Sequence, residues 1–228
     1  MRSGDLLLEI GAGTGEIGSE IARLHGLYVG LDLSRPMLGA FRRREAGLAA
    51  PLGLVVADAN ATWPITDHSV QAIFGSRSLH LLSLDRVVEE AFRVLRGSGS
   101  ALVIGRVHRD PQSVKERMRH EMRRLLRSGT STSRRGENRS RPLIDALVER
   151  GAVAFAPQVV ARWTTTHSPA ESLRNWKSKP GLAGTSVPEQ AKAQVLSKLE
   201  SWAVAEFQNL DRSLESEEEY LLEGAITA

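Results

Sequence analysis

The chain has 228 residues, of which 41% are hydrophobic and 25% are charged, so it is long enough to fold as one domain with a substantial core. It has no cysteine, which excludes disulfides and thiolate metal sites and makes a cytoplasmic location the simplest expectation. No apolar run is long enough to predict a helix that spans a membrane. The formal net charge of +3 hides a basic block between Arg106 and Arg141, where 12 Lys or Arg stand against 4 Asp or Glu.

The first half of the chain alternates short apolar runs with helical patterns. The predicted strands cover residues 5–10, 28–32, 53–57, 70–75 and 100–106, and the predicted helices lie near 16–24, 35–48 and 85–96. This alternation predicts βαβ units, and so an α/β fold with a doubly wound, mostly parallel sheet and helices on both faces. In such a fold the ligand lies at the carboxyl ends of the strands.

A glycine-rich turn joins the first predicted strand to the first helix, in the sequence Leu8-Glu9-Ile10-Gly11-Ala12-Gly13-Thr14-Gly15. Glycines without a Cβ let a ligand approach the backbone. The turn fits the dinucleotide pattern G-x-G-x-x-G and also a G-x-G-x-G pattern that follows an acidic residue. Because Glu9 would repel a pyrophosphate, we favour a cofactor with a cationic amino-acid end.

Polar or glycine residues also follow the other predicted strands. Gly11, Asp32, Asp58 and Ser76 each stand at the end of one strand, so we expect them to share one site. A carboxylate at position 32 can accept hydrogen bonds from both hydroxyls of a ribose, although an N-cap role before Ser34 is the alternative.

The second half begins with a predicted charged helix over 111–127. A loop over 128–141, a helix over 142–150, a strand or strand pair over 153–165, helices over 169–177 and 188–207 and an edge strand over 218–226 follow. The basic block in this half could attract an anionic substrate or nucleic acid, but it contains no aromatic residue for base stacking. We therefore favour a solvated helix face there.

Five sequence blocks occur together in one order. They are L-E-I-G-A-G-T-G at 8–15, V-G-L-D-L-S at 29–34, A-D-A-N-A-T-W-P-I at 57–65, S-L-H-L-L at 78–82 and E-E-A-F-R-V-L-R at 89–96. Through these blocks, residues 4 to about 106 resemble the class I S-adenosylmethionine-dependent methyltransferases, specifically the type 11 methyltransferase family.

The resemblance implies a Rossmann-like, seven-stranded sheet whose final hairpin is antiparallel, with helices of the 111–150 region over the substrate site as a lid. It implies a single methyltransferase domain over 1–228, with a cofactor-binding half at 1–106, a basic helical lid-like segment at 107–152 and a sheet-completing half at 153–228. It also implies that Asp58 and Ala59 contact adenine. The full set of cofactor-binding residues that we expect is Glu9, Gly11, Ala12, Gly13, Thr14, Gly15, Asp32, Leu33, Met37, Asp58, Ala59, Gly75 and Ser76.

The function implied is methyl transfer from S-adenosyl-L-methionine to a small-molecule acceptor. His80 is a weak candidate for a general base, although a structural role is favoured for it. No histidine pair has metal-ligand spacing, so no metal is expected. The alternatives are a non-catalytic cofactor-binding protein, a nucleic-acid methyltransferase and an NAD-dependent oxidoreductase. The sequence leaves the acceptor and the oligomeric state open.

Overall fold

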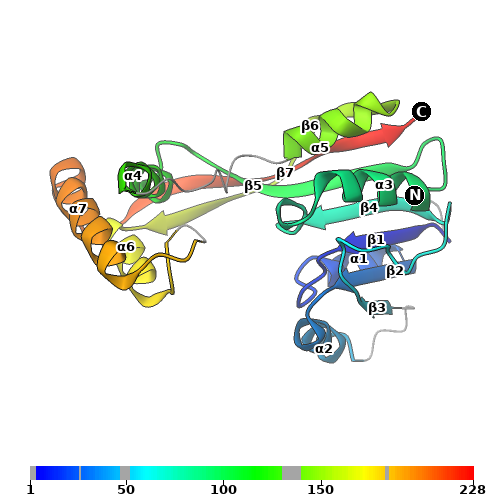
Figure 1. Ribbon diagram of the computed structural model, residues 1–228, viewed down its shortest axis with the longest axis horizontal. Coiled ribbons are helices and arrows are strands. Elements are labelled where there is room, and N and C mark those ends of the chain that lie inside the picture. The colour runs from blue at the N-terminus through cyan, green and yellow to red at the C-terminus, as the bar shows by residue number, and fades with distance from the viewer. Residues whose placement is uncertain (1–3, 26, 47–51, 130–139, 183–184) are drawn as a thin grey trace. The chain divides into compact units, whose positions relative to one another are not determined.

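A computed structural model describes residues 4–25, 27–46, 52–129, 140–182 and 185–228 of the chain (Figure 1). The chain divides into two units. Of the described residues, those within 1–106, 138–160 and 221–228 form unit 1, and those within 107–137 and 161–220 form unit 2.

Five of the strands pair in parallel, as the alternating sequence pattern predicts. They are β1 (Leu6–Ile10), β2 (Leu27–Asp32), β3 (Leu52–Val56), β4 (Val70–Ser76) and β5 (Ala101–Arg109). β1 lies between β2 and β4, β3 pairs with the outer side of β2, and β5 pairs with β4. All five therefore point their carboxyl ends toward the same edge of the sheet.

The last two strands are β6 (Ala152–His167) and β7 (Leu214–Thr227), and the sheet order is β3-β2-β1-β4-β5-β7-β6. Thr227 at the end of β7 exchanges backbone hydrogen bonds with Gly99 and Ser100, just before β5, so β7 runs antiparallel to β5. The prediction of a final edge strand over 218–226 is wrong, because β7 lies between β5 and β6. Strand order depends on long-range pairing that a local pattern does not contain.

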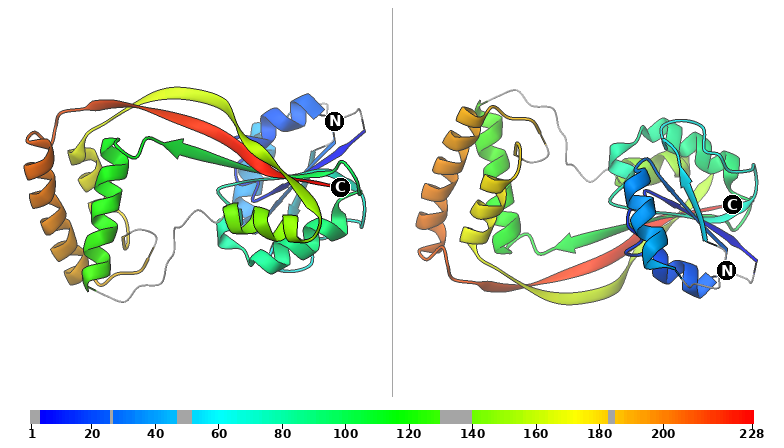
Figure 2. Two further views of the ribbon diagram at one scale, coloured as in Figure 1. Left: turned by 90° about the horizontal axis from the view of Figure 1, so that it is seen from above. Right: turned by 90° about the horizontal axis from the view of Figure 1, so that it is seen from below.

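Helices cover both faces of the sheet in unit 1, because successive strand residues point to opposite sides. α1 (Gly18–His25) and α2 (Arg35–Arg44) pack with Leu7, Tyr28 and Phe74 on one face. The short helix η1 (Leu79–Leu81), α3 (Leu84–Val94) and α5 (Ser140–Glu149) belong to the other face, with Leu8 and Ile73. α3 and α5 lie side by side (Figure 2).

Unit 2 is built around three helices, α4 (Val114–Gly129), α6 (Pro169–Ser178) and α7 (Glu189–Phe207). α4 presents Val114, Met118, Met122 and Leu126 at four-residue spacing to a core that includes Leu199 of α7. The three helices lie together in both views of Figure 2. This unit thus has its own hydrophobic core.

The predicted lid-like segment over 107–152 is divided between the two units. α4 belongs to unit 2, whereas Leu143, Ile144 and Leu147 of α5 are buried in the sheet core of unit 1. The expected loop over 128–141 falls mostly on residues 130–139, which lie outside the described residues, as do residues 47 and 48 at the end of the predicted helix 35–48. The role of the segment as a lid stays a prediction.

Three of the five arginines of α4 are paired with carboxylates of their own unit. Arg124 bonds Glu121, Arg119 bonds Glu116 at 3.0 Å, and Arg117 pairs with a glutamate of α7. Much of the positive charge of the basic block is therefore balanced locally, as a solvated helix face would be.

A buried ion pair fixes the loop between β3 and β4. Glu90 of α3 accepts a 2.7 Å hydrogen bond from the backbone N–H of Trp63 and bonds Arg93 at 2.6 Å. Arg93 also donates to the carbonyls of Trp63 and Ile65, both at 2.8 Å. Burial would raise the pKa of Glu90, but the hydrogen bonds from Arg93 and Trp63 outweigh it and hold the pKa below its ordinary value.

We predict that Glu90→Gln lowers the free energy of unfolding by about 2 kcal/mol at pH 7. A glutamine oxygen can still accept the N–H of Trp63, but the side chain loses its charge and its amide NH2 group would face the donors of Arg93. Since the folded-state pKa of Glu90 is lowered, its contribution is present above the pKa of the unfolded chain and is lost as pH falls. The deficit of the variant should therefore shrink at about pH 4, as measured by urea unfolding.

The neighbouring Glu89→Gln is the matched control, because Glu89 is exposed and pairs with Arg86 on the helix surface. It should change stability by less than about 0.5 kcal/mol. Equal stability of Glu90→Gln and the wild type at pH 7 would contradict this account of the loop.

Candidate functional site

A pocket of about 670 Å³ lies in unit 1, where the carboxyl ends of β1, β2, β3 and β4 meet. Its lining consists of residues from the loops that follow these strands. They are Glu9, Ile10, Gly11, Ala12, Gly13, Thr14, Glu16, Ile17, Leu31, Asp32, Leu33, Met37, Ala57, Asp58, Ala59, Asn60, Ser76, Arg77, Ser78, Leu81 and Leu82. The pocket size is typical of sites for small molecules and cofactors.

Two glycines of the turn after β1 have different surroundings: Gly11 is closely packed, whereas Gly13 faces open space. Gly11 has a φ of +78°, and a Cβ there would lie 2.2 Å from the Cβ of Ser78. Gly13 has a φ of +55°, but a Cβ there would meet nothing within 4 Å. The backbone of Gly13 therefore faces open space, which a ligand can approach closely.

Asp32 joins this turn to the end of β2. Its Oδ2 accepts a hydrogen bond from the Gly13 N–H and its Oδ1 accepts one from the Ser34 N–H, both at 2.8 Å. A carboxylate has about four lone-pair positions, so each oxygen retains acceptor capacity for a ligand. The structure thus holds Asp32 in one orientation at the pocket wall.

Glu9 lies at the end of β1 and is 3% exposed. Tyr28 of β2 donates its hydroxyl to Glu9 Oε2. Burial raises the pKa of Glu9 to about 7, with a further increase from the charge of Asp32, and the hydrogen bond from Tyr28 only partly offsets this. A cationic group in the pocket would favour the ionised form of this carboxyl.

The loop after β3 contributes Asp58, Ala59 and Asn60. Asp58 Oδ1 accepts the Asn60 N–H at 2.9 Å, and Asn60 Oδ1 accepts the Ser83 N–H at 2.8 Å. The Trp63 indole N–H donates to the Ala59 carbonyl at 3.0 Å. The loop is therefore fixed to the beginning of α3 and to the sheet core.

Leu33 and Met37 lie beside this pocket and are exposed for 70% and 47% of their surface. At these exposures neither side chain is part of the hydrophobic core. Apolar side chains left exposed at the rim of a pocket can cover the face of a bound ring.

Gly15 and Gly75 are the two predicted residues that do not line the pocket. A Cβ at Gly15 would lie 2.3 Å from the Phe41 ring, and one at Gly75 would lie 2.7 Å from Leu79. Close packing explains both glycines. His80 is in η1, but its side chain lies outside the described residues.

Several lining residues were absent from the predicted set of cofactor-binding residues. They are Ile10, Glu16, Ile17, Leu31, Ala57, Asn60, Arg77, Ser78, Leu81 and Leu82. Ser78 joins two of the loops, because its hydroxyl donates to the carbonyl of Ile10 and so links the loop after β4 to β1. The rule that ligands lie beyond strand ends could have identified the polar residues among them, since they follow β1, β3 and β4.

In the part of the chain that the structure describes, three or more His, Asp or Glu side chains nowhere gather in a way that could hold a metal ion. The described helices also include none with the length and apolar character needed to cross a bilayer.

Comparisons of sequence identify relatives of part of the chain. Residues 7–99 match a family described as "Methyltransferase domain". The demethylmenaquinone methyltransferase of Thermobifida fusca (strain YX) is 31% identical over 104 residues, which are 44% of this chain and 43% of that protein. The chain thus matches less than half of the length of this curated relative.

Solved structures resemble the whole chain. The YcgJ protein of Bacillus subtilis has a TM-score of 0.60 and 16% identity, covering 100% of this chain and 94% of the other. The geranyl diphosphate C-methyltransferase of Streptomyces coelicolor A3(2), solved with Mg²⁺, geranyl diphosphate and S-adenosyl-L-homocysteine, has a TM-score of 0.54 and 16% identity, covering 100% and 76%. At these identities the likeness concerns the fold, and it confirms the predicted Rossmann-like sheet.

We predict that Glu9→Gln removes a pH dependence of stability. A buried carboxyl whose folded pKa is raised to about 7 destabilises the protein as pH rises from about 4.5 to 7, because the unfolded chain loses its proton first. At about 1.4 kcal/mol per pKa unit, the loss is on the order of 3 kcal/mol. Glutamine keeps the acceptor for Tyr28 without the charge.

Urea unfolding at pH 5 and pH 8 measures this difference. The wild type should lose stability relative to Glu9→Gln between these values. Parallel pH profiles for the two proteins would show that Glu9 is ionised throughout and would refute the raised pKa.

Proposed function

We propose that this chain binds S-adenosyl-L-methionine in the strand-end pocket and transfers its methyl group to a small-molecule acceptor, because residues 7–99 match the family described as "Methyltransferase domain". The single observation that carries the proposal is the carboxylate of Asp32, held by Gly13 and Ser34 at the wall of a pocket that also opens onto the Gly13 backbone.

Asp32 is proposed to bind the ribose. A ribose diol offers two hydroxyl donors, and both oxygens of this carboxylate retain a lone pair. The hydrogen bonds from Gly13 and Ser34 orient the carboxylate before the ligand arrives, so little rotamer entropy is lost on binding.

The loop after β3 is proposed to bind the adenine. The Asp58 carboxylate can accept the exocyclic amino group, and the Ala59 N–H can donate to a ring nitrogen. The exposed side chains of Leu33 and Met37 would cover the ring face. Because Ala59 and Asn60 are fixed by Trp63 and Ser83, this part of the site is preorganised.

The methionine end is proposed to lie along the turn after β1, against Gly11, Ala12, Gly13, Thr14 and Ser76. Glu9 lies in β1 directly before this turn, and its carboxylate can attract the positive charges of the ammonium and sulfonium groups. Gly15 and Gly75 would act indirectly, by allowing Phe41 and Leu79 to pack close to the backbone.

S-adenosyl-L-methionine, when bound, supplies the electrophilic methyl group, so the chain's own residues mainly orient the two reactants and exclude water. The apolar side chains of Leu81 and Leu82 line the same pocket and fit the second task. A general base is needed only where the acceptor loses a proton as it attacks, and His80 stays the candidate for that role.

A small-molecule acceptor is supported by the size of the pocket and by the proteins that share the fold, which include methyltransferases solved with geranyl diphosphate and with phosphomonomethylethanolamine. A nucleic-acid acceptor is disfavoured because three of the five arginines of α4 are paired with glutamates. The cytoplasm is the proposed setting, which the cysteine-free composition favours.

We predict that S-adenosyl-L-homocysteine binds the wild-type chain and that Asp32→Ala weakens this binding at least about tenfold, because the variant loses hydrogen bonds to a charged acceptor. Isothermal titration calorimetry measures both affinities, and NAD in the same titration should give no binding.

Asp85→Ala is the matched control, since Asp85 is an exposed carboxylate on α3 outside the pocket lining. Asp58→Ala is a second test variant. Apart from its proposed contact with adenine, the Asp58 side chain accepts one hydrogen bond, from the N–H of Asn60 in the same turn. Binding of NAD without binding of S-adenosyl-L-homocysteine, or equal affinities for the Asp32 and Asp85 variants, would contradict the proposal.

A further inference from the structure

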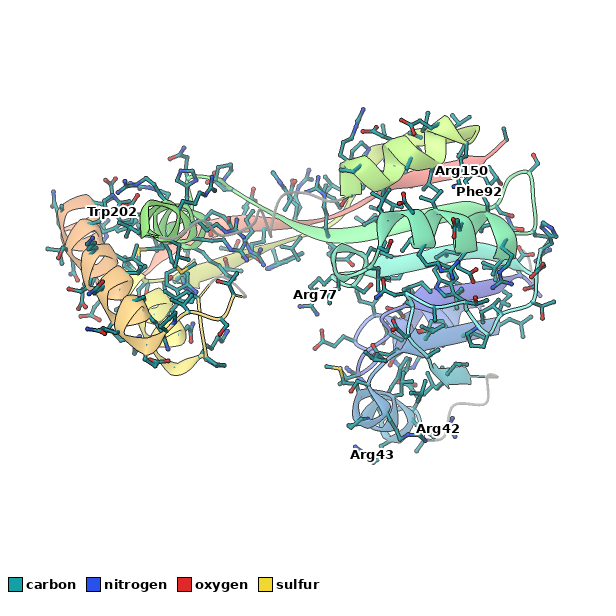
Figure 3. The ribbon with its side chains drawn as sticks, viewed as in Figure 1. Arg42, Arg43, Arg77, Phe92, Arg150 and Trp202 are labelled. Atoms are coloured by element: carbon teal, nitrogen blue, oxygen red, sulfur yellow. The ribbon has the colours of Figure 1, made fainter. Side chains whose placement is uncertain are left out.

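Arg77 occupies an unusual place at the end of β4. It directly follows Ser76, lines the pocket and has a φ of +57°, in the left-handed region that residues other than glycine seldom adopt. Figure 3 shows its side chain projecting from the loop after β4, whereas Arg42 and Arg43 lie on α2. Among the described residues that line the pocket, Arg77 is the only Lys or Arg.

The charge around Arg77 is otherwise negative. The lining contains four acidic residues, Glu9, Glu16, Asp32 and Asp58. These carboxylates suit a cationic cofactor and repel an anion. An anionic group that enters the pocket would therefore be directed to Arg77, whose planar guanidinium can bind a carboxylate or phosphate through two parallel hydrogen bonds.

The existing partner of Arg77 is Glu16, which belongs to the turn before α1. The two side chains pair at 3.2 Å and are 72% and 67% exposed. An ion pair so exposed to solvent contributes little to stability and exchanges readily. Glu16 thus keeps the guanidinium of Arg77 at the pocket, and the guanidinium can still leave this weak ion pair to bind another anion.

The backbone conformation gives a separate argument. Glycine would adopt the left-handed conformation of position 77 without strain, whereas arginine adopts it at a cost. Strain of this kind is often found where the side chain has a role in binding. Nothing in the fold requires an arginine side chain there, because its ion pair is on the surface.

We propose that Arg77 binds an oxyanion, a carboxylate or a phosphate carried by the methyl acceptor, and that Glu16 occupies the guanidinium when the acceptor is absent. The inference rests on the proposed function, which places the methionine end of the cofactor against Ser76 and so the acceptor beside Arg77. The acceptor is then an anionic small molecule, and Arg77 determines specificity.

The test uses two probes, inorganic pyrophosphate for a phosphate and benzoate for a carboxylate, each added to the full chain saturated with S-adenosyl-L-homocysteine. The measured quantity is the NMR shift of the Arg77 side-chain N–H. We expect a saturable shift with at least one probe, and the tighter probe identifies the class of oxyanion. Affinity measured by protein resonances near the pocket should fall about tenfold or more in Arg77→Gln.

Glu16→Gln gives a readout that a merely structural role would not produce. Removing the competing carboxylate should tighten the binding of the probe, while Arg42→Gln, an exposed arginine of α2 outside the pocket, should leave it unchanged. Arg77→Gly should keep the unfolding midpoint at or above that of the wild type and still lose the probe, so misfolding cannot explain the loss.

Two results would overturn the inference while leaving the proposed function intact. One is the absence of any shift of Arg77 with either probe in a chain that binds S-adenosyl-L-homocysteine. The other is an Arg77→Gln variant that loses affinity for S-adenosyl-L-homocysteine itself, because Arg77 would then hold the cofactor's carboxylate. Failure of the wild type to bind S-adenosyl-L-homocysteine would overturn the proposed function and this inference with it.

Discussion

The carboxylate of Asp32 connects the two loops on which the pocket depends. Through the N–H groups of Gly13 and Ser34 it ties the turn after β1 to the beginning of α2. The carbonyl of Leu31 accepts the N–H groups of Gly11 and Ala12, at 2.7 and 3.1 Å, and strengthens the same connection. The turn can follow this path only because glycines there adopt positive φ angles. Geometry for binding a ligand is thus present before any ligand is bound.

Electrostatics divides the pocket into regions with different preferences. Glu9 is a buried residue of the pocket lining, and its pKa is raised. A cationic ligand nearby would lower this pKa and favour the ionised carboxylate, so Glu9 favours a cationic ligand. Arg77 and Glu16 form an exposed pair, which an incoming anion can separate. A positively charged cofactor and a negatively charged acceptor would therefore be bound by different side chains of one pocket. Such an arrangement would suit the proposed methyl transfer, in which both molecules must be held at once.

The sequence predicts the strands and the polar residues at their ends, because parallel strands are apolar runs and their carboxyl ends share one edge. Asp32 and Asp58 were found in this way. The glycine pattern placed Gly15 in the ligand turn, but a Cβ there would collide with the ring of Phe41. A glycine pattern does not distinguish a glycine needed for ligand binding from one needed for close packing. Local patterns do not encode contacts between distant parts of the chain. Three features depend on such contacts: the position of β7, the division into two units, and the ion pair of Arg77 with Glu16.

A crystal structure of the chain grown with S-adenosyl-L-homocysteine tests the central claim most directly. The account predicts ribose hydroxyls within hydrogen-bond distance of both oxygens of Asp32, the adenine amino group at Asp58 and the amino-acid end along the backbone of Gly11 and Gly13. Density for the ligand at another place, or an empty pocket at saturating ligand, would contradict it.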